Sequence, residues 1–300
     1  MDILDKKIKP LLPEEFIDFY FREDWKMKIG KDYGLFHINR LEDALPDIKF
    51  PLPPHRKTVF DFIFLTEGTS KRSKGLDEYE FSDSTFFFIP AFQITSHEFV
   101  QPDSKGFFCY FDAQIFDDIF PHNTLFDDLS FLQAFSEPIV KVSNDMKDYT
   151  ITILERLEKI YLNPQTIDLG LVSLLLATIF RELELVEQKQ VNIPKKAAST
   201  LTKKFKNLLA QHIYKTKKVT DYAEMLSISP DFLNRSVKAF TGKTAHDVLT
   251  DMIVLEAKVM LRQTDLSISE IAFKLSETNP SDFIRLFKNK VGKTPQKYRK

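Results

Sequence analysis

The first 140 residues are patterned as short apolar and aromatic runs separated by turn-forming residues. The runs lie at residues 34–38, 58–65, 84–90 and 106–112. Runs of this length bounded by Gly, Pro, Asp and Ser are typical of β-strands, and several in succession indicate a sandwich or a barrel. A short amphipathic helix is expected before them, near residues 13–21.

From residue 144 to residue 190 the apolar positions change to helical spacing. The stripe is interrupted at Asn163-Pro164, which predicts two consecutive helices. The second helix is strongly apolar across residues 169–180 and therefore needs a partner surface. That surface is either the β domain of the same chain or a second copy of the chain, so a homodimer through residues 141–190 stays one of two alternatives.

The last hundred residues contain one pattern twice. The first copy begins at Ser229-Pro230 and ends before Gly242, and the second begins at Asn279-Pro280 and ends before Gly292. Ser and Asn are good N-cap residues, Pro suits the first helical position, and Gly suits the position after the last. The repeat therefore predicts one capped helix in each copy.

Each predicted helix follows a second shared pattern, a small residue with a leucine three positions later: Ala223-x-x-Leu226 and Ala272-x-x-Leu275. A small residue lets a crossing helix approach closely, so each copy predicts two helices joined by a short turn. In the first copy Leu233, Val237 and Phe240 fall at helical spacing and are expected to face inward, which leaves a polar and mostly basic face outward.

A long helix without Gly or Pro is predicted between the two copies, over residues 245–262. The whole layout, over roughly residues 200–300, resembles the DNA-binding domain of the AraC/XylS family of transcriptional activators. Its most specific part is Ile268-Ser269-Glu270-Ile271-Ala272, followed by Phe283-x-Arg285-x-Phe287-Lys288 and Gly292-Lys293-Thr294-Pro295. The resemblance implies an all-α, double helix-turn-helix domain at residues 201–300 that binds double-stranded DNA in successive major-groove segments.

The resemblance also implies two sets of DNA contacts. The base-facing positions are Asp231, Asn234 and Arg235 in the first copy and Ser281, Ile284 and Arg285 in the second. Arg can pair with guanine and Asn with adenine. The positions placed for phosphates are Lys238, Lys243, Thr244, Lys288, Lys293 and Thr294. A surface ion pair is the alternative interpretation of the two arginines.

The sequence departs from the family pattern at two places. Most members carry Gly then Phe in the second turn, where this chain has Ser276-Glu277, and an Arg where this chain has Ile253. Because Gly adopts left-handed backbone freely, Ser276 predicts an altered second turn. A receptor that has lost DNA binding is therefore one alternative, against which the intact arginines stand.

Charge divides the chain near residue 200. Residues 201–300 hold 19 Lys and Arg against 10 Asp and Glu, whereas residues 1–200 hold 23 against 33. A basic segment on an acidic chain is the expected electrostatic footprint of a nucleic-acid-binding module. A polar stretch with Pro194 predicts an exposed linker at residues 191–200, just before the basic segment.

In the family a cupin-like barrel often precedes the DNA-binding domain and senses an effector. The resemblance implies the same order here: an α+β protein with a cupin-like β-barrel or sandwich at residues 1–140, a helical pair at 141–190 and the C-terminal all-α domain. We expect a transcriptional regulator that responds to a small-molecule effector in its N-terminal domain. No apolar run is long enough to span a bilayer and no signal peptide is present, which predicts a cytoplasmic chain.

Enzymes form the main alternative class. A cupin-type enzyme fused to a DNA-binding module would place two His one residue apart, then a Glu and a further His, and the chain lacks that spacing. His55 and His97 are expected to be solvated loop residues. DNA-repair methyltransferases with a similar module need reactive cysteines, whereas the single Cys109 lies in an apolar strand pattern and is expected to be buried. We therefore expect no catalytic residue, no cofactor and no metal.

Overall fold

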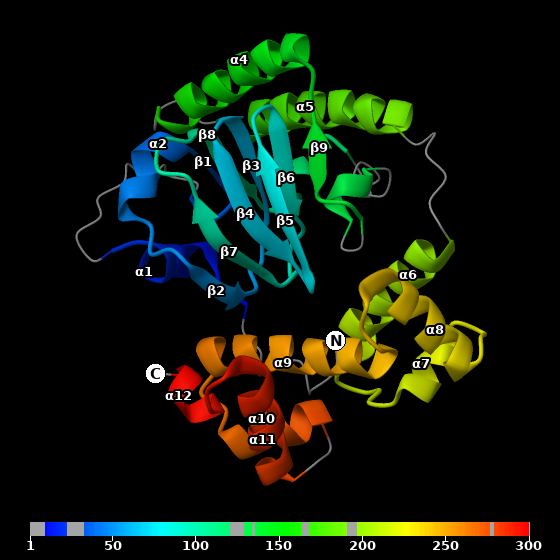
Figure 1. Ribbon diagram of the computed structural model, residues 1–300. Coiled ribbons are helices and arrows are strands. Elements are labelled where there is room, and N and C mark those ends of the chain that lie inside the picture. The colour runs from blue at the N-terminus through cyan, green and yellow to red at the C-terminus, as the bar shows by residue number, and fades with distance from the viewer. Residues whose placement is uncertain are drawn as a thin grey trace. The chain divides into compact units, whose positions relative to one another are not determined.

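The computed structural model describes residues 10–22, 33–120, 129–133, 136–163, 168–190, 197–276 and 279–299. Contacts divide the chain into two compact units, one built from Pro10–Asn192 and one that includes Ile193–Lys300. Figure 1 shows that the first unit holds the sheets and the second is built of helices. The α+β class predicted from the sequence, with a β domain before an all-α domain, is confirmed.

Two antiparallel sheets form the centre of the first unit, as far as the structure describes it. One has the strand order β1-β8-β3-β6-β9 and the other the order β2-β7-β4-β5. The strands are β1 (Phe36–Arg40), β2 (Leu52–His55), β3 (Phe60–Glu67), β4 (Thr69–Lys74), β5 (Asp77–Ser82), β6 (Thr85–Ile89), β7 (Thr95–Val100), β8 (Lys105–Phe111) and β9 (Ile139–Lys141).

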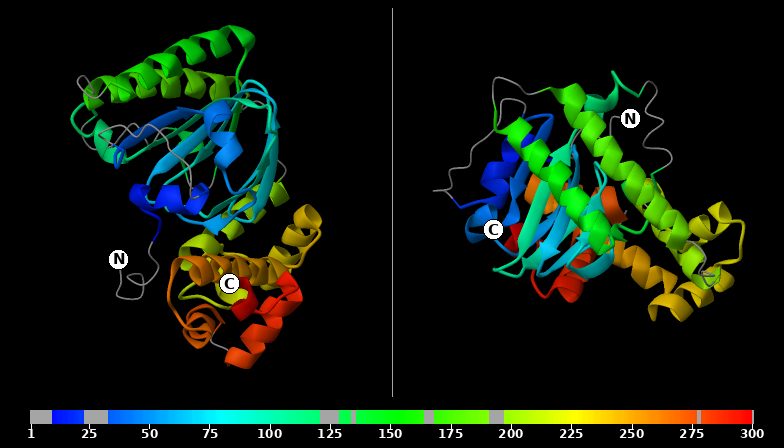
Figure 2. Two further views of the ribbon diagram at one scale, coloured as in Figure 1. Left: turned by 90° about the vertical axis from the view of Figure 1, so that its left-hand side faces the viewer. Right: turned by 90° about the horizontal axis from the view of Figure 1, so that it is seen from above.

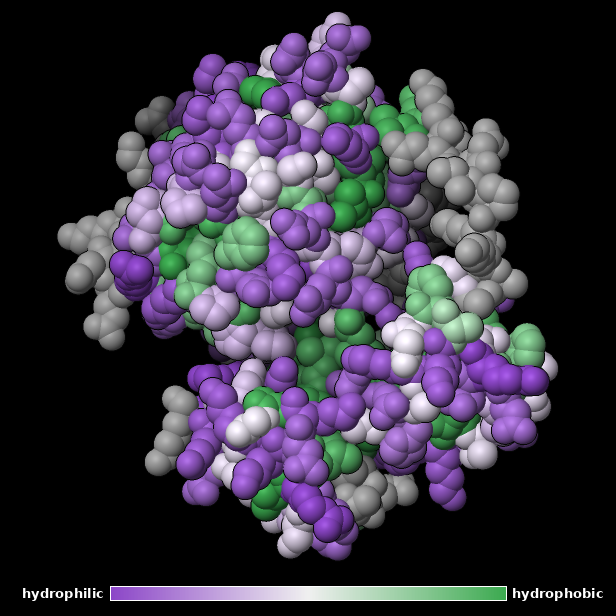
Figure 3. Space-filling model, in the orientation of Figure 1, coloured by the Kyte–Doolittle hydropathy of each residue, from purple (hydrophilic) through white to green (hydrophobic). Residues whose placement is uncertain are grey.

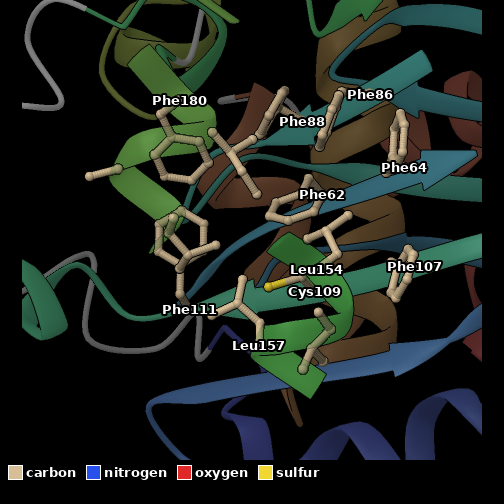
Figure 4. Packing of buried hydrophobic residues seen from close by; sticks show 14 of the residues in the cluster. Phe62, Phe64, Phe86, Phe88, Phe107, Cys109, Phe111, Leu154, Leu157 and Phe180 are labelled. Carbon is tan, nitrogen blue, oxygen red and sulfur yellow. The ribbon is translucent and has the colours of Figure 1, made fainter. Parts of the chain in front are cut away.

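The apolar runs predicted as strands are β1, β3, β6 and β8, and they lie next to one another. Successive side chains of β3 point to opposite faces, so Phe62 and Phe64 pack on one side while Ile63 and Leu65 pack on the other. Figure 4 shows Phe62, Phe64, Phe86 and Phe88 gathered on the same face as Phe180. Because both faces of this sheet are covered, most residues of these strands are apolar, which explains the continuous apolar runs in the sequence.

The four strands of the second sheet were not predicted, because β4, β5 and β7 are mainly polar and β2 contains two prolines. β4, for example, reads Thr-Ser-Lys-Arg-Ser-Lys, yet Arg72 and Lys74 are buried. The expectation that His55 and His97 are solvated loop residues is wrong. His55 ends β2, His97 lies in β7, and both are buried because their side chains face the interior of the unit.

Two helices, α4 (Asn144–Tyr161) and α5 (Leu169–Gln190), cover the outer face of the five-stranded sheet, side by side in Figures 1 and 2. Leu154 and Leu157 of α4 and Phe180 of α5 belong to the same buried cluster as the strand phenylalanines. The predicted helical pair therefore packs on its own chain, and the homodimer stays a prediction. The shorter helices of this unit are η2 (Pro13–Glu15), α1 (Phe16–Tyr20), α2 (Leu41–Ala44), η3 (Leu45–Asp47), η4 (Ala113–Phe116) and η6 (Ser130–Leu132).

The second unit consists of helices throughout its described part. They are α6 (Ala197–His212), α7 (Val219–Met225), α8 (Pro230–Thr241), α9 (Ala245–Gln263), α10 (Ile268–Ser276), α11 (Pro280–Val291) and α12 (Pro295–Arg299). Helix α6 begins inside the predicted linker, of which residues 191–196 lie outside the described residues.

The helix caps predicted from the repeat are confirmed. The Ser229 side chain accepts a hydrogen bond from the Phe232 N–H (3.2 Å), and the Asn279 side chain accepts one from the Asp282 N–H (2.9 Å). Gly242 and Gly292 end the two helices in left-handed conformation, with φ of 74° and 81°. The predicted alteration of the second turn falls on Ser276-Glu277, and Glu277 lies outside the described residues.

Helix α9 is the central helix of the second unit, because it contacts α6, α7 and α8 as well as α10, α11 and α12. Its buried side chains include Val248, Met252 and Val259, and Ile253 is buried as well. Of the three residues of α8 expected to face inward, Leu233 and Val237 are fully buried, but Phe240 is 49% exposed. That expectation is wrong for Phe240, which lies in the last turn of α8, where neighbouring helices no longer cover it.

Candidate nucleic-acid interface and cavity

The outward face of α8 carries three of the predicted contact residues. Asp231, Arg235 and Lys238 are all exposed. Arg235 makes no hydrogen bond or ion pair with any other described residue, so its guanidinium is available to an incoming group. Figure 3 shows that hydrophilic side chains cover most of the visible face of this unit.

Asn234 lies on the same helix but is half-buried. Its Oδ1 accepts a hydrogen bond from the Ala245 N–H (3.0 Å), at the first residue of α9. The first N–H groups of a helix have no partner within it, so Asn234 satisfies one of them and ties α8 to α9. A contact of Asn234 with a base stays a prediction, and its amide nitrogen has no partner among the described residues.

Helix α11 presents the equivalent face with different local pairing. Ser281, Arg285 and Lys288 are exposed, and Ile284 is half-buried. Arg285 Nη2 lies 3.0 Å from Asp282 Oδ1, one turn earlier on the same helix. Both side chains are largely exposed, and a surface pair of this kind is worth only about 0–1 kcal/mol. The pair orients Arg285 along the helix without holding it strongly.

A carboxylate on α9 holds two lysines near the C-terminal ends of α8 and α11. Asp251 Oδ2 lies 2.7 Å from Lys243 Nζ, and its Oδ1 lies 2.9 Å from Lys290 Nζ. Burial of the Asp251 carboxyl raises its pKa, but hydrogen bonds from the two lysines lower it more, so the net pKa is below its ordinary value. Lys243 is therefore part of a shared ion pair rather than a free cation.

The two predicted threonines cap helices. The Thr244 hydroxyl accepts from the Asp247 N–H (3.1 Å) and Asp247 Oδ2 accepts from the Thr244 N–H (3.2 Å), which forms a capping box at the start of α9. The Thr244 hydroxyl also donates to Asp247 Oδ2 (2.6 Å). Thr294 Oγ1 accepts from the Lys297 N–H (3.4 Å) at the start of α12. Phosphate contacts by these side chains stay predictions, and for Thr244 they would compete with its cap.

Sequence reasoning missed two exposed residues on this surface, Phe232 and Lys290. The Phe232 ring lies in the first turn of α8, one turn before Arg235, and is 48% exposed. An exposed aromatic ring at the start of a recognition helix is a candidate contact to a thymine methyl group. The signal was present in the repeat, since Phe232 occupies the position that Asp282 takes in the second copy.

A cavity lies inside the first unit, lined by residues of both sheets and of α1 and α2. It encloses about 680 Å³ of space not filled by atoms, open solvent at its mouth included. The lining is mainly aromatic and aliphatic, with Phe16, Phe50, Leu52, Ile63 and Phe108 among its members. An apolar lining with a few polar groups is the composition of small-molecule sites.

Three buried histidines line this cavity. His55 Nδ1 donates to the Pro53 carbonyl (2.8 Å), since a carbonyl can only accept, and His55 Nε2 therefore accepts from the Tyr20 hydroxyl (2.6 Å). Burial lowers the pKa of His55 to about 3 and that of His37 to about 4, and it lowers the pKa of His97 well below its ordinary value. All three are neutral at pH 7.

Cys109 on β8 is fully buried, as expected from the sequence. Burial raises the pKa of its thiol well above the ordinary value. Within the described ranges, no three His, Cys, Asp or Glu side chains are grouped closely enough to hold a metal ion. The helices the structure describes include none long and apolar enough to cross a bilayer.

Comparison with known proteins agrees with the geometry of the second unit. A family model described as a helix-turn-helix domain matches residues 222–300. This segment is an AraC-type helix-turn-helix domain. The match begins within α7 and covers α8, α9 and α11. Among solved structures, the C-terminal domain of AraT, a response regulator from Geobacillus stearothermophilus, is 27% identical with a TM-score of 0.33 and covers 35% of this chain and 87% of that one.

Two curated relatives each match part of the chain. The bifunctional transcriptional activator/DNA repair enzyme AdaA of Bacillus subtilis (strain 168) is 34% identical over 97 residues, which is 31% of this chain. The Msm operon regulatory protein of Streptococcus mutans serotype c is 26% identical over 126 residues, which is 42% of this chain. The chain spans only about half the length of these relatives, 46% and 44% respectively.

Three of the solved structures, all of ToxT from Vibrio cholerae, compare with most of the chain. Unsaturated fatty acid-bound ToxT from Vibrio cholerae strain SCE256 covers 88% of this chain and 95% of its own, at 12% identity and a TM-score of 0.40.

Proposed function

We propose that the chain is a sequence-specific, DNA-binding transcriptional regulator in which α8 and α11 enter successive major-groove segments. The observation that carries the proposal is the repeat itself: two helices with the same caps present the same outward positions, and α9 holds both. Paired recognition helices of this kind read sites about one helical turn, ~34 Å, apart.

The described side chains support a division of roles on this surface. Arg235 and Arg285 are exposed at equivalent positions of the two helices, and an arginine can pair bidentately with guanine. Lys238 and Lys288 are exposed one turn later, where contacts to phosphates add affinity without sequence information. The net charge of +9 over residues 201–300 favours both kinds of contact.

We infer that the regulator responds to a small molecule held in the cavity of the first unit. The cavity has the apolar lining of a ligand site, and its histidines and tyrosines supply oriented polar groups. A ligand changes DNA binding only when it favours one conformation of the protein over another. The proposed response is therefore measurable as a change in DNA affinity when the cavity is filled.

The second candidate class of function is an enzyme. AdaA carries a repair activity in addition to activation, but its match to this chain covers 31% of the chain. Repair by alkyl transfer needs a reactive thiolate, whereas the Cys109 thiol is fully buried and held protonated by burial. The described geometry therefore favours regulation over catalysis.

The test is selection of a cognate duplex from a random pool by the purified chain, followed by titration of that duplex and of a scrambled one at several salt concentrations. We expect a clear preference for the selected duplex and an affinity that falls steeply with salt. Lys293→Ala should weaken binding to both duplexes alike and reduce the salt slope by about one unit. Lys105→Ala, which removes a surface lysine of the first unit, is the matched control. Equal affinity for both duplexes would reject sequence-specific regulation.

A further inference from the structure

A buried ion cluster lies at the wall of the cavity. Lys57, Asp61 and Arg72 are only 2%, 0% and 4% exposed. The Lys57 ammonium donates a hydrogen bond to Asp61 Oδ2, and Arg72 Nη1 lies 2.7 Å from Asp61 Oδ1. Lys57 and Arg72 line the cavity, whereas Asp61 lies behind them and does not. The cavity therefore meets the cationic side of the cluster.

The charges of this cluster do not balance. It holds two cations and one carboxylate, an excess of one positive charge. The other titratable groups that face Lys57 from the packed elements are His55 of β2, His97 of β7 and Tyr20 of α1, and burial keeps all three neutral at pH 7. Among the described lining residues, Lys57 and Arg72 are thus the charged ones.

The two cations also keep hydrogen-bonding capacity. The Lys57 ammonium has three N–H groups, and its partners among the described residues are Asp61 and the rings of Phe16, Tyr20 and Phe108 at 5.6–5.9 Å. Arg72 uses Nε toward Thr95 Oγ1 (3.1 Å) and Nη1 toward Asp61, which leaves Nη2 without a partner in the described part of the chain. Donors on both cations are open to a further acceptor.

We propose that this cluster is the head-group site of the cavity, and that the ligand is a monocarboxylate with an apolar body. This inference rests on the proposed function for its regulatory meaning, and it names the class of effector. One carboxylate neutralises the excess charge and accepts from the open donors of Lys57 and Arg72. The aromatic and aliphatic walls then cover the apolar body.

The physical reason is the cost of an uncompensated charge. A buried cation without a counter-ion is strongly unfavourable, whereas a buried pair with its hydrogen bonds satisfied is tolerated. Burial lowers the pKa of Lys57 to about 8, while Asp61 opposes that shift and Arg72 adds to it. A ligand carboxylate beside the ammonium favours its charged form, so the bound state has a higher Lys57 pKa than the free state.

Calorimetric titration of the purified full chain with compounds that share one skeleton tests the proposal. The probes are 3-phenylpropanoate, 3-phenylpropan-1-ol and 3-phenylpropylamine, with octanoate and octan-1-ol as a straight-chain set. We expect each carboxylate to bind at least about tenfold more tightly than its alcohol, because hydrogen bonds to charged groups are the stronger kind. The amine should not bind. The preferred skeleton then distinguishes an aromatic body from an aliphatic one.

Lys57→Met separates ligand binding from folding. The substitution removes the excess charge and leaves Asp61 paired with Arg72, so the fold should persist in a thermal melt while the preference for carboxylate over alcohol is lost. The control Lys105→Met removes an exposed lysine paired with Glu67 on the surface, and it should keep the preference. Titration at pH 8.5 in two buffers of different ionisation enthalpy should show proton uptake on carboxylate binding in the natural chain and none in Lys57→Met.

The outcomes separate this inference from the proposed function. Equal affinities for carboxylate and alcohol, or carboxylate binding that survives Lys57→Met, would overturn the head-group site even if the chain binds its selected duplex. A carboxylate that binds through Lys57 supports the site, and a change in duplex affinity on its addition joins the site to regulation. Carboxylate binding with unchanged duplex affinity would support the site and reject the effector response instead.

Discussion

The two helix-turn-helix copies share a scaffold and differ in the chemistry on its surface. Both recognition helices have a side-chain N-cap, a proline in the first turn and a left-handed glycine at the end. On α8, however, Arg235 has no described partner and Phe232 stands exposed, whereas on α11 Arg285 pairs with Asp282. The positions that build the fold are repeated, while those that face outward have diverged. The second copy is therefore expected to read a different sequence, and less tightly.

The largest expected effect is that of the two arginines. Arg235→Ala should cost about 1–3 kcal/mol of binding to the selected duplex and relax discrimination at one base pair. Arg285→Ala should cost less, because the guanidinium must leave Asp282 before it can reach a base. Titration of each variant against selected and scrambled duplexes measures both effects. Equal losses on the two duplexes would mean that the arginines contact only the backbone.

The glycine caps should behave alike, in contrast to the arginines. A Cβ added at Gly242 or Gly292 would meet nothing within 4 Å, so the cost of alanine there is that of left-handed backbone alone. Each substitution should lower the free energy of unfolding by about 1–2 kcal/mol. Urea denaturation of the two variants measures this. A difference between them well beyond about 1 kcal/mol would show that the caps are not equivalent.

Phe232 gives a smaller effect that is specific to the first copy. If its ring contacts a thymine methyl group, Phe232→Ala should cost about 1 kcal/mol on the selected duplex. Replacing thymine by uracil removes only that methyl group, so one such replacement should weaken binding of the natural chain and leave the variant unaffected. A ring that faces solvent in the complex would show no coupling between the two changes.

The smallest effect concerns Asp251, which ties a lysine from each copy. Asp251→Asn should release Lys243 and Lys290 and strengthen binding to all duplexes by a few fold. Titration of the variant against the selected and scrambled duplexes measures this change.

The same substitution tests the lowered pKa of Asp251 through the pH dependence of folding stability. Because the Asp251 pKa is lower in the folded state than in the unfolded state, its ion pairs stabilise the fold at neutral pH, and this contribution is lost as the pH falls below about 4. The stability difference between the natural chain and the variant should therefore shrink in acid.

Local rules were sufficient for the second unit. Helix starts and ends depend on a few neighbouring residues, so Ser229, Asn279 and the two glycines could be assigned from the sequence alone. The pairing of exposed side chains was not predictable in the same way. Asn234 reaches the start of α9, eleven positions away, and Asp251 joins lysines from both copies, because the folded unit brings distant backbone together.

In the first unit, the sequence pattern predicted the apolar strands but not the polar ones. Its apolar strands could be recognised because both faces of their sheet are covered and their side chains follow one another without polar interruption. From their sequences alone, the polar strands β4 and β7 resemble exposed segments, and only their pairing in the second sheet buries part of each. Only then do Arg72, His97 and Lys57 acquire buried partners that offset the cost of removing them from water.

The sequence by itself therefore determined the order of the units, the helix-turn-helix repeat and the basic character of the second unit, because these depend on local spacing and composition. The tertiary structure alone decided that α4 and α5 pack on their own sheet, that three histidines are buried and neutral, and that two cations face one cavity. Burial changes the charge and partners of a side chain through residues far apart in the sequence, and no local pattern carries that information.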